Sequence, residues 1–249
     1  MSVAYEHDKS KIWELSENLI VLTAGDALDY VDLFEQVMTK IPLRARLPIL
    51  EVTEIVKEEY LELRGKKIED EFFKPKGLSM EWFYENQNIL NETLALTLDR
   101  KIEEYDFDLF LIIAGVDQKG AHIYFVHTPD MEELMGTYSC YDSMGYCTVG
   151  TGDRHSDMVF VASRYTSSFS LKNALYVCYE AKKKAELAVG VGKNFTDIIV
   201  IDKEGVTHLN ETVKELDEIY KQSLELDNSK QSELRTSISS LDVKELQKE

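Results

Sequence analysis

The chain has 249 residues, a length that suits one large domain, and 44% of them are hydrophobic, which is ample for a sizeable core. Its 46 acidic residues outnumber 28 lysines and arginines, and the net charge of −18 argues against nucleic acid or anionic lipid as a partner. No apolar run approaches the roughly 20 residues that span a bilayer, and the N-terminus lacks the apolar core of a signal peptide. Three cysteines without a CxxC pair fit a reducing compartment, so we expect a soluble, cytoplasmic protein with no membrane partner.

The first elements have clear local signals. Residues 19–24 read LIVLTA, a continuous apolar run that is typical of a strand buried on both faces, and Gly25 ends it. Apolar residues at helical spacing then predict a helix over 27–40, with Asp26 as its N-cap and Pro42 beyond its end.

The next segment predicts an enlarged helical layer. Pro48 should open a second helix of roughly 49–64, and a charged turn should follow over 64–77. Ser79 is a candidate cap for one long amphipathic helix over 80–102, whose apolar residues recur along one side.

The second half of the chain predicts hairpins flanked by paired helices. The expected elements, in order, are strands 108–116 and 121–127 as one hairpin, a short strand 146–150, helices 153–163 and 170–188, and a hairpin of 196–201 with 206–209. From about Asn228 onward a polar composition predicts a frayed helix or a mobile tail. Hairpins with paired helices indicate an α+β fold with helices outside mainly antiparallel sheets.

Four sequence words follow one another with compatible gaps: KIWEL with LIVLTAGDA, then FLIIAGVDQKGAHIYFVHTPD, then VGTG, and finally SLKNALYVCYEAKKKAE with FTDIIVIDKEGV. Together they resemble the proteasome subunit family of the N-terminal-nucleophile hydrolase superfamily over roughly residues 10–209. The resemblance implies a four-layer αββα sandwich over 1–210 with a helical insertion at about 42–105, followed by an acidic C-terminal helix or tail over 211–249. It also implies stacked rings, built as a homo-oligomer or with related proteasome-like subunits.

The resemblance further implies a threonine-type peptidase site. In that family an N-terminal threonine attacks the peptide carbonyl, and its own α-amine receives the proton because the amine's pKa lies near working pH. A lysine keeps that amine neutral, and a glycine N–H stabilises the oxyanion. Lys11 matches the family lysine and Gly25 matches the oxyanion glycine. Read alone, they are a solvated lysine and a turn glycine.

Several positions depart from the family pattern. By the spacing to the matched lysine, the threonine would lie on strands that precede the first residue, so we expect this chain to lack the nucleophile. Val189 and Gly192 fall where active subunits carry an aspartate and a serine, and Asp153 falls where a serine is common. Ser2 could become N-terminal, but it lies at the wrong end of the matched strand. Whether the chain is an enzyme therefore stays open.

The residues and the resemblance leave three functions open. The first is a threonine-type endopeptidase subunit in intracellular protein breakdown, acting on polypeptides. The second is a catalytically inactive ring or scaffold protein of the same fold, and the third is a stand-alone N-terminal-nucleophile amidohydrolase. The five histidines show no metal-binding spacing, and the GTG and GVG triplets lack the third glycine of a dinucleotide loop, so we expect neither a metal nor a cofactor.

Overall fold

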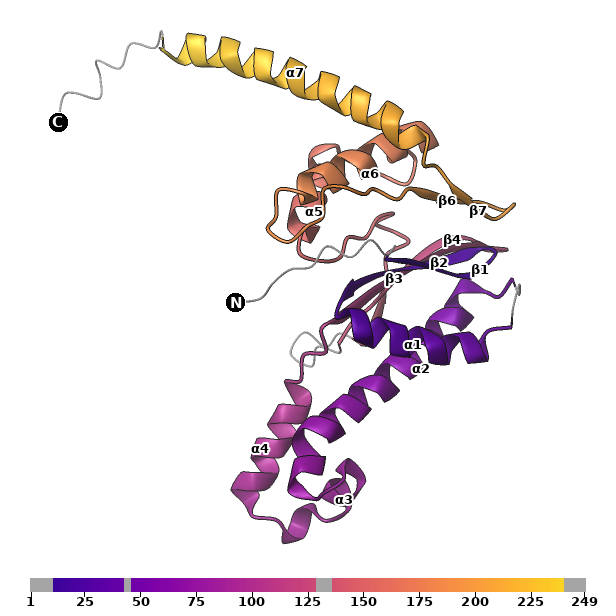
Figure 1. The fold of residues 1–249 in the computed structure, drawn as a ribbon, viewed down its shortest axis with the longest axis vertical. Coiled ribbons are helices and arrows are strands. Elements are labelled where there is room, and N and C mark those ends of the chain that lie inside the picture. Colours follow the sequence, from indigo (N-terminus) through magenta and orange to yellow (C-terminus); the bar gives the residue numbers. More distant parts are fainter. Residues whose placement is uncertain (1–10, 43–45, 129–135, 240–249) are drawn as a thin grey trace, which may run out of the picture.

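A computed structural model describes residues 11–42, 46–128 and 136–239. Its centre is a five-stranded antiparallel sheet in the order β1-β2-β3-β4-β5 (Figure 1). The strands are β1 (Ile12–Ser16), β2 (Leu19–Gly25), β3 (Leu109–Asp117), β4 (Gly120–Val126) and β5 (Tyr138–Cys140). The predicted central hairpin is confirmed, since β3 pairs with β4. Strand β5 was not predicted, because three residues leave no alternation pattern and pairing with β4 defines it.

Helices α1 (Ala27–Lys40) and α2 (Ile49–Ile68) cover one face of this sheet (Figure 1). Alternate strand residues point toward these helices, and Val21, Leu111 and Ile113 are completely buried there. The neighbouring strand residues on the other face point away from α1 and α2. The main core of the protein therefore lies between the sheet and the first two helices.

The starts of these two helices have different causes. Asp26 is the N-cap of α1, as predicted, and its carboxylate accepts a hydrogen bond of 2.8 Å from the Leu28 N–H. Pro48 precedes α2 and has no side-chain cap to offer. Instead, Asp117 at the end of β3 accepts the Ile49 N–H at 3.1 Å. The sheet thus fixes where α2 begins.

The predicted charged turn over 64–77 is wrong. Helix α2 continues to Ile68 and is extended by a π-helical segment, η1 (Glu69–Phe73), and a short 3-10 segment, η2 (Lys74–Lys76). Gly77, with a φ of 69°, then reverses the chain. Charge made this segment look like a turn, but Ile68 and Phe73 are buried and hold it in a helical path.

The single long helix predicted over 80–102 is also wrong, because two helices occupy that segment. Helix α3 (Met80–Glu85) begins at the predicted cap Ser79, and α4 (Glu92–Glu103) begins at Asn91, whose side chain accepts the Leu94 N–H. An asparagine that bonds to nearby backbone competes with helix continuation.

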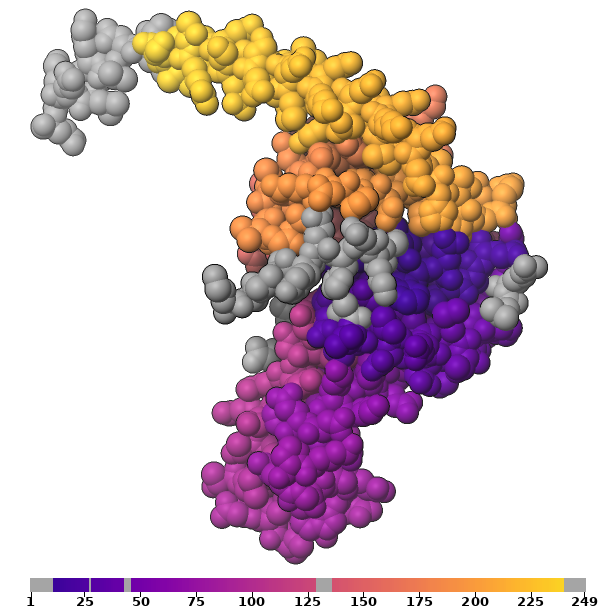
Figure 2. Space-filling view, viewed as in Figure 1, coloured from indigo at the N-terminus to yellow at the C-terminus, as the bar shows by residue number. Residues whose placement is uncertain are grey.

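Residues 68–105 together form what we call the helical lobe. Ile68, Phe73, Phe83 and Leu98 make a small buried cluster there, separate from the main core. Figure 2 shows the lobe projecting from one end of the molecule. No helix in the described ranges is both long and apolar enough to cross a bilayer.

A second layer lies on the other side of the sheet from α1 and α2 (Figure 1). It contains α5 (Asp153–Ala162), α6 (Leu171–Ala185), a two-stranded sheet of β6 (Ile199–Ile201) and β7 (Val206–His208), and α7 (Thr212–Ser239). Helices α5 and α6 and the hairpin were predicted, although the strands are shorter than expected.

Two features of this layer differ from the predictions. The strand expected over 146–150 does not form, and these residues run as irregular chain. The frayed helix or tail expected from Asn228 is a regular helix as far as Ser239, with Leu216 and Tyr220 anchoring its first half. The observed class is therefore α+β with a mainly antiparallel sheet.

Polar contacts join the two layers at the turn between β1 and β2. Arg46 donates hydrogen bonds to the carbonyl oxygens of Lys203 and Glu204 in the β6–β7 turn, at 2.6 and 2.9 Å. His208 on β7 contacts Glu14 on β1 at 2.6 Å. These contacts lie at the opposite end of β2 from Gly25.

Candidate functional site

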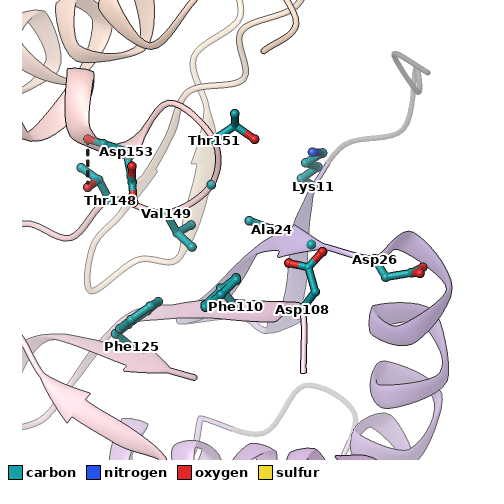
Figure 3. A pocket seen from close by; sticks show the side chains of 12 residues that line it. Lys11, Ala24, Asp26, Asp108, Phe110, Phe125, Thr148, Val149, Thr151 and Asp153 are labelled. Atoms are coloured by element: carbon teal, nitrogen blue, oxygen red, sulfur yellow. Dashed lines mark hydrogen bonds between the residues drawn. The ribbon is translucent and has the colours of Figure 1, made fainter. Parts of the chain in front are cut away.

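A cavity of about 460 Å³ lies at the end of β2, between the sheet and the loop that leads into α5 (Figure 3). Ligand pockets typically occupy about 300–1,000 Å³, so its size suits a small molecule or a few residues of a peptide. Residues from both layers line it: Lys11, Ala24, Gly25, Asp26, Asp108, Phe110, Phe125, Thr148, Val149, Gly150, Thr151 and Asp153.

Gly25 lies where β2 leaves the sheet. Its φ is 110°, and a Cβ added there would sit 2.0 Å from the Asp108 carbonyl oxygen. That same oxygen accepts the Asp26 N–H at 2.9 Å, which holds the two strands at this distance. The position therefore requires glycine for both its backbone angle and its close contact.

The direction of the Gly25 N–H follows from strand alternation. The Thr23 N–H donates to the Lys11 carbonyl oxygen at 2.9 Å, on the β1 side of β2. Two residues later, the Gly25 N–H faces the same side. Within the described residues β1 begins at Ile12, and the Gly25 N–H faces the side of β2 on which Lys11 lies.

The backbone of Lys11 is fixed while its side chain is exposed. Its carbonyl oxygen accepts the Thr23 N–H and lies 3.3 Å from the Thr23 hydroxyl. In Figure 3 the ammonium lies above Asp108 and the end of β2, and Lys11 lines the cavity. The structure thus brings Lys11 and Gly25, the two residues singled out in the sequence, to one cavity.

The opposite wall is the loop before α5. Gly150, with a φ of 98°, comes close enough to β2 that an added Cβ would lie 3.4 Å from the Ala24 Cβ. The Thr148 hydroxyl donates to an Asp157 carboxylate oxygen at 2.6 Å, so this hydroxyl is already engaged. Burial raises the pKa of the adjacent Cys147 thiol to about 12, and a thiolate nucleophile is therefore disfavoured at this wall.

The floor of the cavity combines aromatic rings with a carboxylate. The Phe110 and Phe125 rings lie parallel, with centroids 6.3 Å apart, and both are half-buried. Asp108 lies two residues before Phe110 and so faces the same side of the chain, and its carboxylate points up into the cavity (Figure 3).

The residues of this floor were not predicted as site residues from the sequence. Strand alternation in the predicted hairpin could have indicated Phe110 and Phe125, because it places both on the face away from the main core. No local sequence pattern indicated that Asp108 would belong to the site. Only the close pairing of β2 with β3 brings it beside Gly25.

The further positions that the family resemblance singled out are only partly brought together. Asp153 lines the cavity, but Val189 and Gly192 do not, and Val189 is 94% exposed. Ser2 lies outside the described residues. Among the residues that the structure describes, no group of three histidine, cysteine or acidic side chains could hold a metal ion.

Comparisons with known proteins do not identify a related site. No protein-family model matches the sequence. No curated protein matches it either. Function is therefore inferred from the residues and geometry of the cavity itself.

Proposed function

We propose that this chain is a proteasome-like subunit with the threonine-type endopeptidase fold, acting within an assembly that breaks down polypeptides. One observation carries the proposal: Lys11 and Gly25, 14 positions apart in the sequence, line a single cavity between the two layers. Pairing of β1 with β2 places Lys11 near the end of β2, and the loop before α5 closes one cavity over both residues.

The order of elements supports the same proposal. Apart from the helical lobe and the short strand β5, two strands, two helices, a central hairpin, two helices and a second hairpin follow one another in the order that the family resemblance implies, and α7 comes after them. Helices lie outside on both sides, and the five-stranded and two-stranded sheets lie between them (Figure 1). We propose that this arrangement is the αββα sandwich, with the helical lobe as an insertion.

We propose different chemical roles for Gly25 and Lys11 in the cavity. The Gly25 N–H would donate to the oxyanion that forms when a peptide carbonyl is attacked. The Lys11 ammonium would disfavour a second positive charge and so keep a neighbouring amine neutral. The described hydroxyls of the cavity are those of Thr148 and Thr151, and neither belongs to an N-terminal residue that could supply its own amine as base.

Covalent labelling and N-terminal sequencing of the protein isolated from its native source test the proposal. N-terminal sequencing should find a threonine upstream of Met1, and a threonine-directed epoxyketone should form one adduct on that residue, detected by intact mass. The Lys11→Ala variant should lose labelling, whereas Lys172→Ala, which removes an exposed lysine outside the cavity, should keep it. Equal labelling of both variants, or hydrolysis of peptide amides by a Lys11→Ala protein at the wild-type rate, would refute the assignment.

A catalytically inactive ring or scaffold protein of the same fold is the second candidate. The position of Val189 favours it, because the family's aspartate site is occupied by an exposed apolar residue that does not reach the cavity. This candidate predicts a high-mass oligomer by light scattering, no adduct with the epoxyketone and no hydrolysis of peptide amides. A monomer in that measurement would remove it.

A further inference from the structure

The cavity floor suggests which substrates this site accepts, an inference that rests on the proposed function for its peptide ligand. Three carboxylate residues, Asp26, Asp108 and Asp153, line the cavity, against one ammonium group, that of Lys11. The whole chain carries a net charge of −18, which repels anionic ligands at long range. The charges that line the cavity and the net charge of the whole chain therefore both favour a cationic ligand.

The three carboxylates are not equivalent. Asp26 accepts the Leu28 N–H as the cap of α1, and Asp153 accepts the Arg154 N–H at 2.5 Å. The Asp108 carboxylate has no side-chain hydrogen bond or ion pair with any residue that the structure describes. Of the three carboxylates, it is therefore the one with neither oxygen engaged by a described residue.

The surface beside Asp108 is apolar. Phe110 and Phe125 continue the floor from the carboxylate as two parallel rings (Figure 3). Lysine and arginine side chains have an aliphatic stem that packs on apolar surface and a charged head, and a guanidinium also stacks on aromatic faces. The cavity floor matches such a side chain, because the aromatic rings can contact its aliphatic stem and the Asp108 carboxylate can bind its charged head.

We propose that the cavity binds a basic side chain of a polypeptide, and that Asp108 is the residue that selects for it. An arginine or lysine would lie along Phe110 and Phe125 with its head at Asp108. Glutamate would be rejected by the carboxylates, and an uncharged glutamine would lose the charge-assisted hydrogen bond. Because a hydrogen bond to a charged group contributes about tenfold or more in affinity, the preference for arginine over glutamine should be of that size.

Peptide binding measured by calorimetry tests this selectivity without requiring hydrolysis. Three end-blocked hexapeptides that differ at one position, arginine, glutamine or glutamate, are titrated into the full chain. We expect the arginine peptide to bind about tenfold or more tightly than the glutamine peptide, with the glutamate peptide weakest, and the difference to shrink as salt is raised. Equal affinities for arginine and glutamine would overturn the inference, as would no binding of any peptide.

Two variants test whether Asp108 is responsible for the preference for arginine. Asp108→Asn should abolish the preference, whereas Asp106→Asn removes the same charge from an exposed residue outside the cavity and should retain it. Thermal melting checks that both variants fold. Loss of the preference in both variants would overturn the role of Asp108.

Hydrolysis of the same peptides is measured in parallel. Selective binding without cleavage would contradict the peptidase proposal alone, and cleavage without selective binding would contradict this inference alone.

Discussion

Gly25 occupies the tightest backbone approach of the candidate site. In a Gly25→Ala variant the new Cβ would sit 2.0 Å from the Asp108 carbonyl oxygen, at a φ of 110°. We expect a loss in unfolding free energy of more than about 1 to 3 kcal/mol, which is the usual cost of backbone strain alone, because a steric clash adds to it. Denaturant unfolding measures this loss. The matched control is Gly77→Ala, which has a φ of 69° but open space around the added Cβ, and an equal loss in both variants would contradict the clash.

His122 links three parts of the fold through its two ring nitrogens. Nδ1 lies 2.7 Å from an Asp142 oxygen and Nε2 lies 3.3 Å from Asp117, the residue that caps α2. The hydrogen bond to Asp142, followed by the charges of both carboxylates, raises the pKa of His122 above its ordinary value near 6.5, although burial opposes this shift. Burial likewise opposes ionisation of the two aspartates, but N–H donors and His122 outweigh it and lower their pKa values.

The raised pKa of His122 determines the direction of its effect on stability. A raised folded-state pKa means that the stabilisation is complete below pH 6.5 and disappears as pH rises through the folded value. The stability difference between wild type and His122→Asn should therefore be larger at pH 6 than at pH 9, as measured by urea unfolding. The exposed His155→Asn variant is the control, and a His122→Asn difference that does not change with pH would contradict the ion pair.

The helical lobe is an element with a core of its own. Phe83 is 1% exposed, and its ring lies 5.4 Å from that of Phe73, within a cluster that the main core does not include. Phe83→Ala should cost about 3 to 5 kcal/mol, and the loss should appear as opening of the lobe while the sheet stays folded. Hydrogen exchange should show lost protection in α3 and α4 with unchanged protection in β3. The neighbouring Tyr84→Ala removes a 48% exposed ring and should have little effect.

At the scale of the whole molecule, Arg46 joins the two layers. Its guanidinium donates to the Lys203 and Glu204 carbonyl oxygens from two different nitrogens. Arg46→Lys keeps the charge but cannot make the forked contact, so hydrogen exchange in β6 and β7 should become faster. Arg235→Lys, on the exposed part of α7, is the matched control. Unchanged exchange in β6 and β7 would show that other contacts hold the layers together.

Much of the element list follows from local sequence, because the responsible interactions are local. The cap of α1 at Asp26, the β3–β4 hairpin and the pair α5 and α6 depend on hydrogen bonds and periodicities within a few residues. The errors fall where distant contacts decide. The expected strand over 146–150 found no partner strand in the described residues, and a buried cluster keeps 64–77 helical despite its charge.

For the candidate site, the sequence alone predicted two residues, Lys11 and Gly25, through a family resemblance, and it determined the acidic charge of the whole chain. Only the tertiary structure decided that both line one cavity, and that Asp108 and Phe110 complete its floor. The physical reason is chain separation. The backbone of Asp108 meets Gly25 across the β2–β3 ladder, with α1, α2 and the helical lobe intervening in sequence, and no local pattern encodes that pairing.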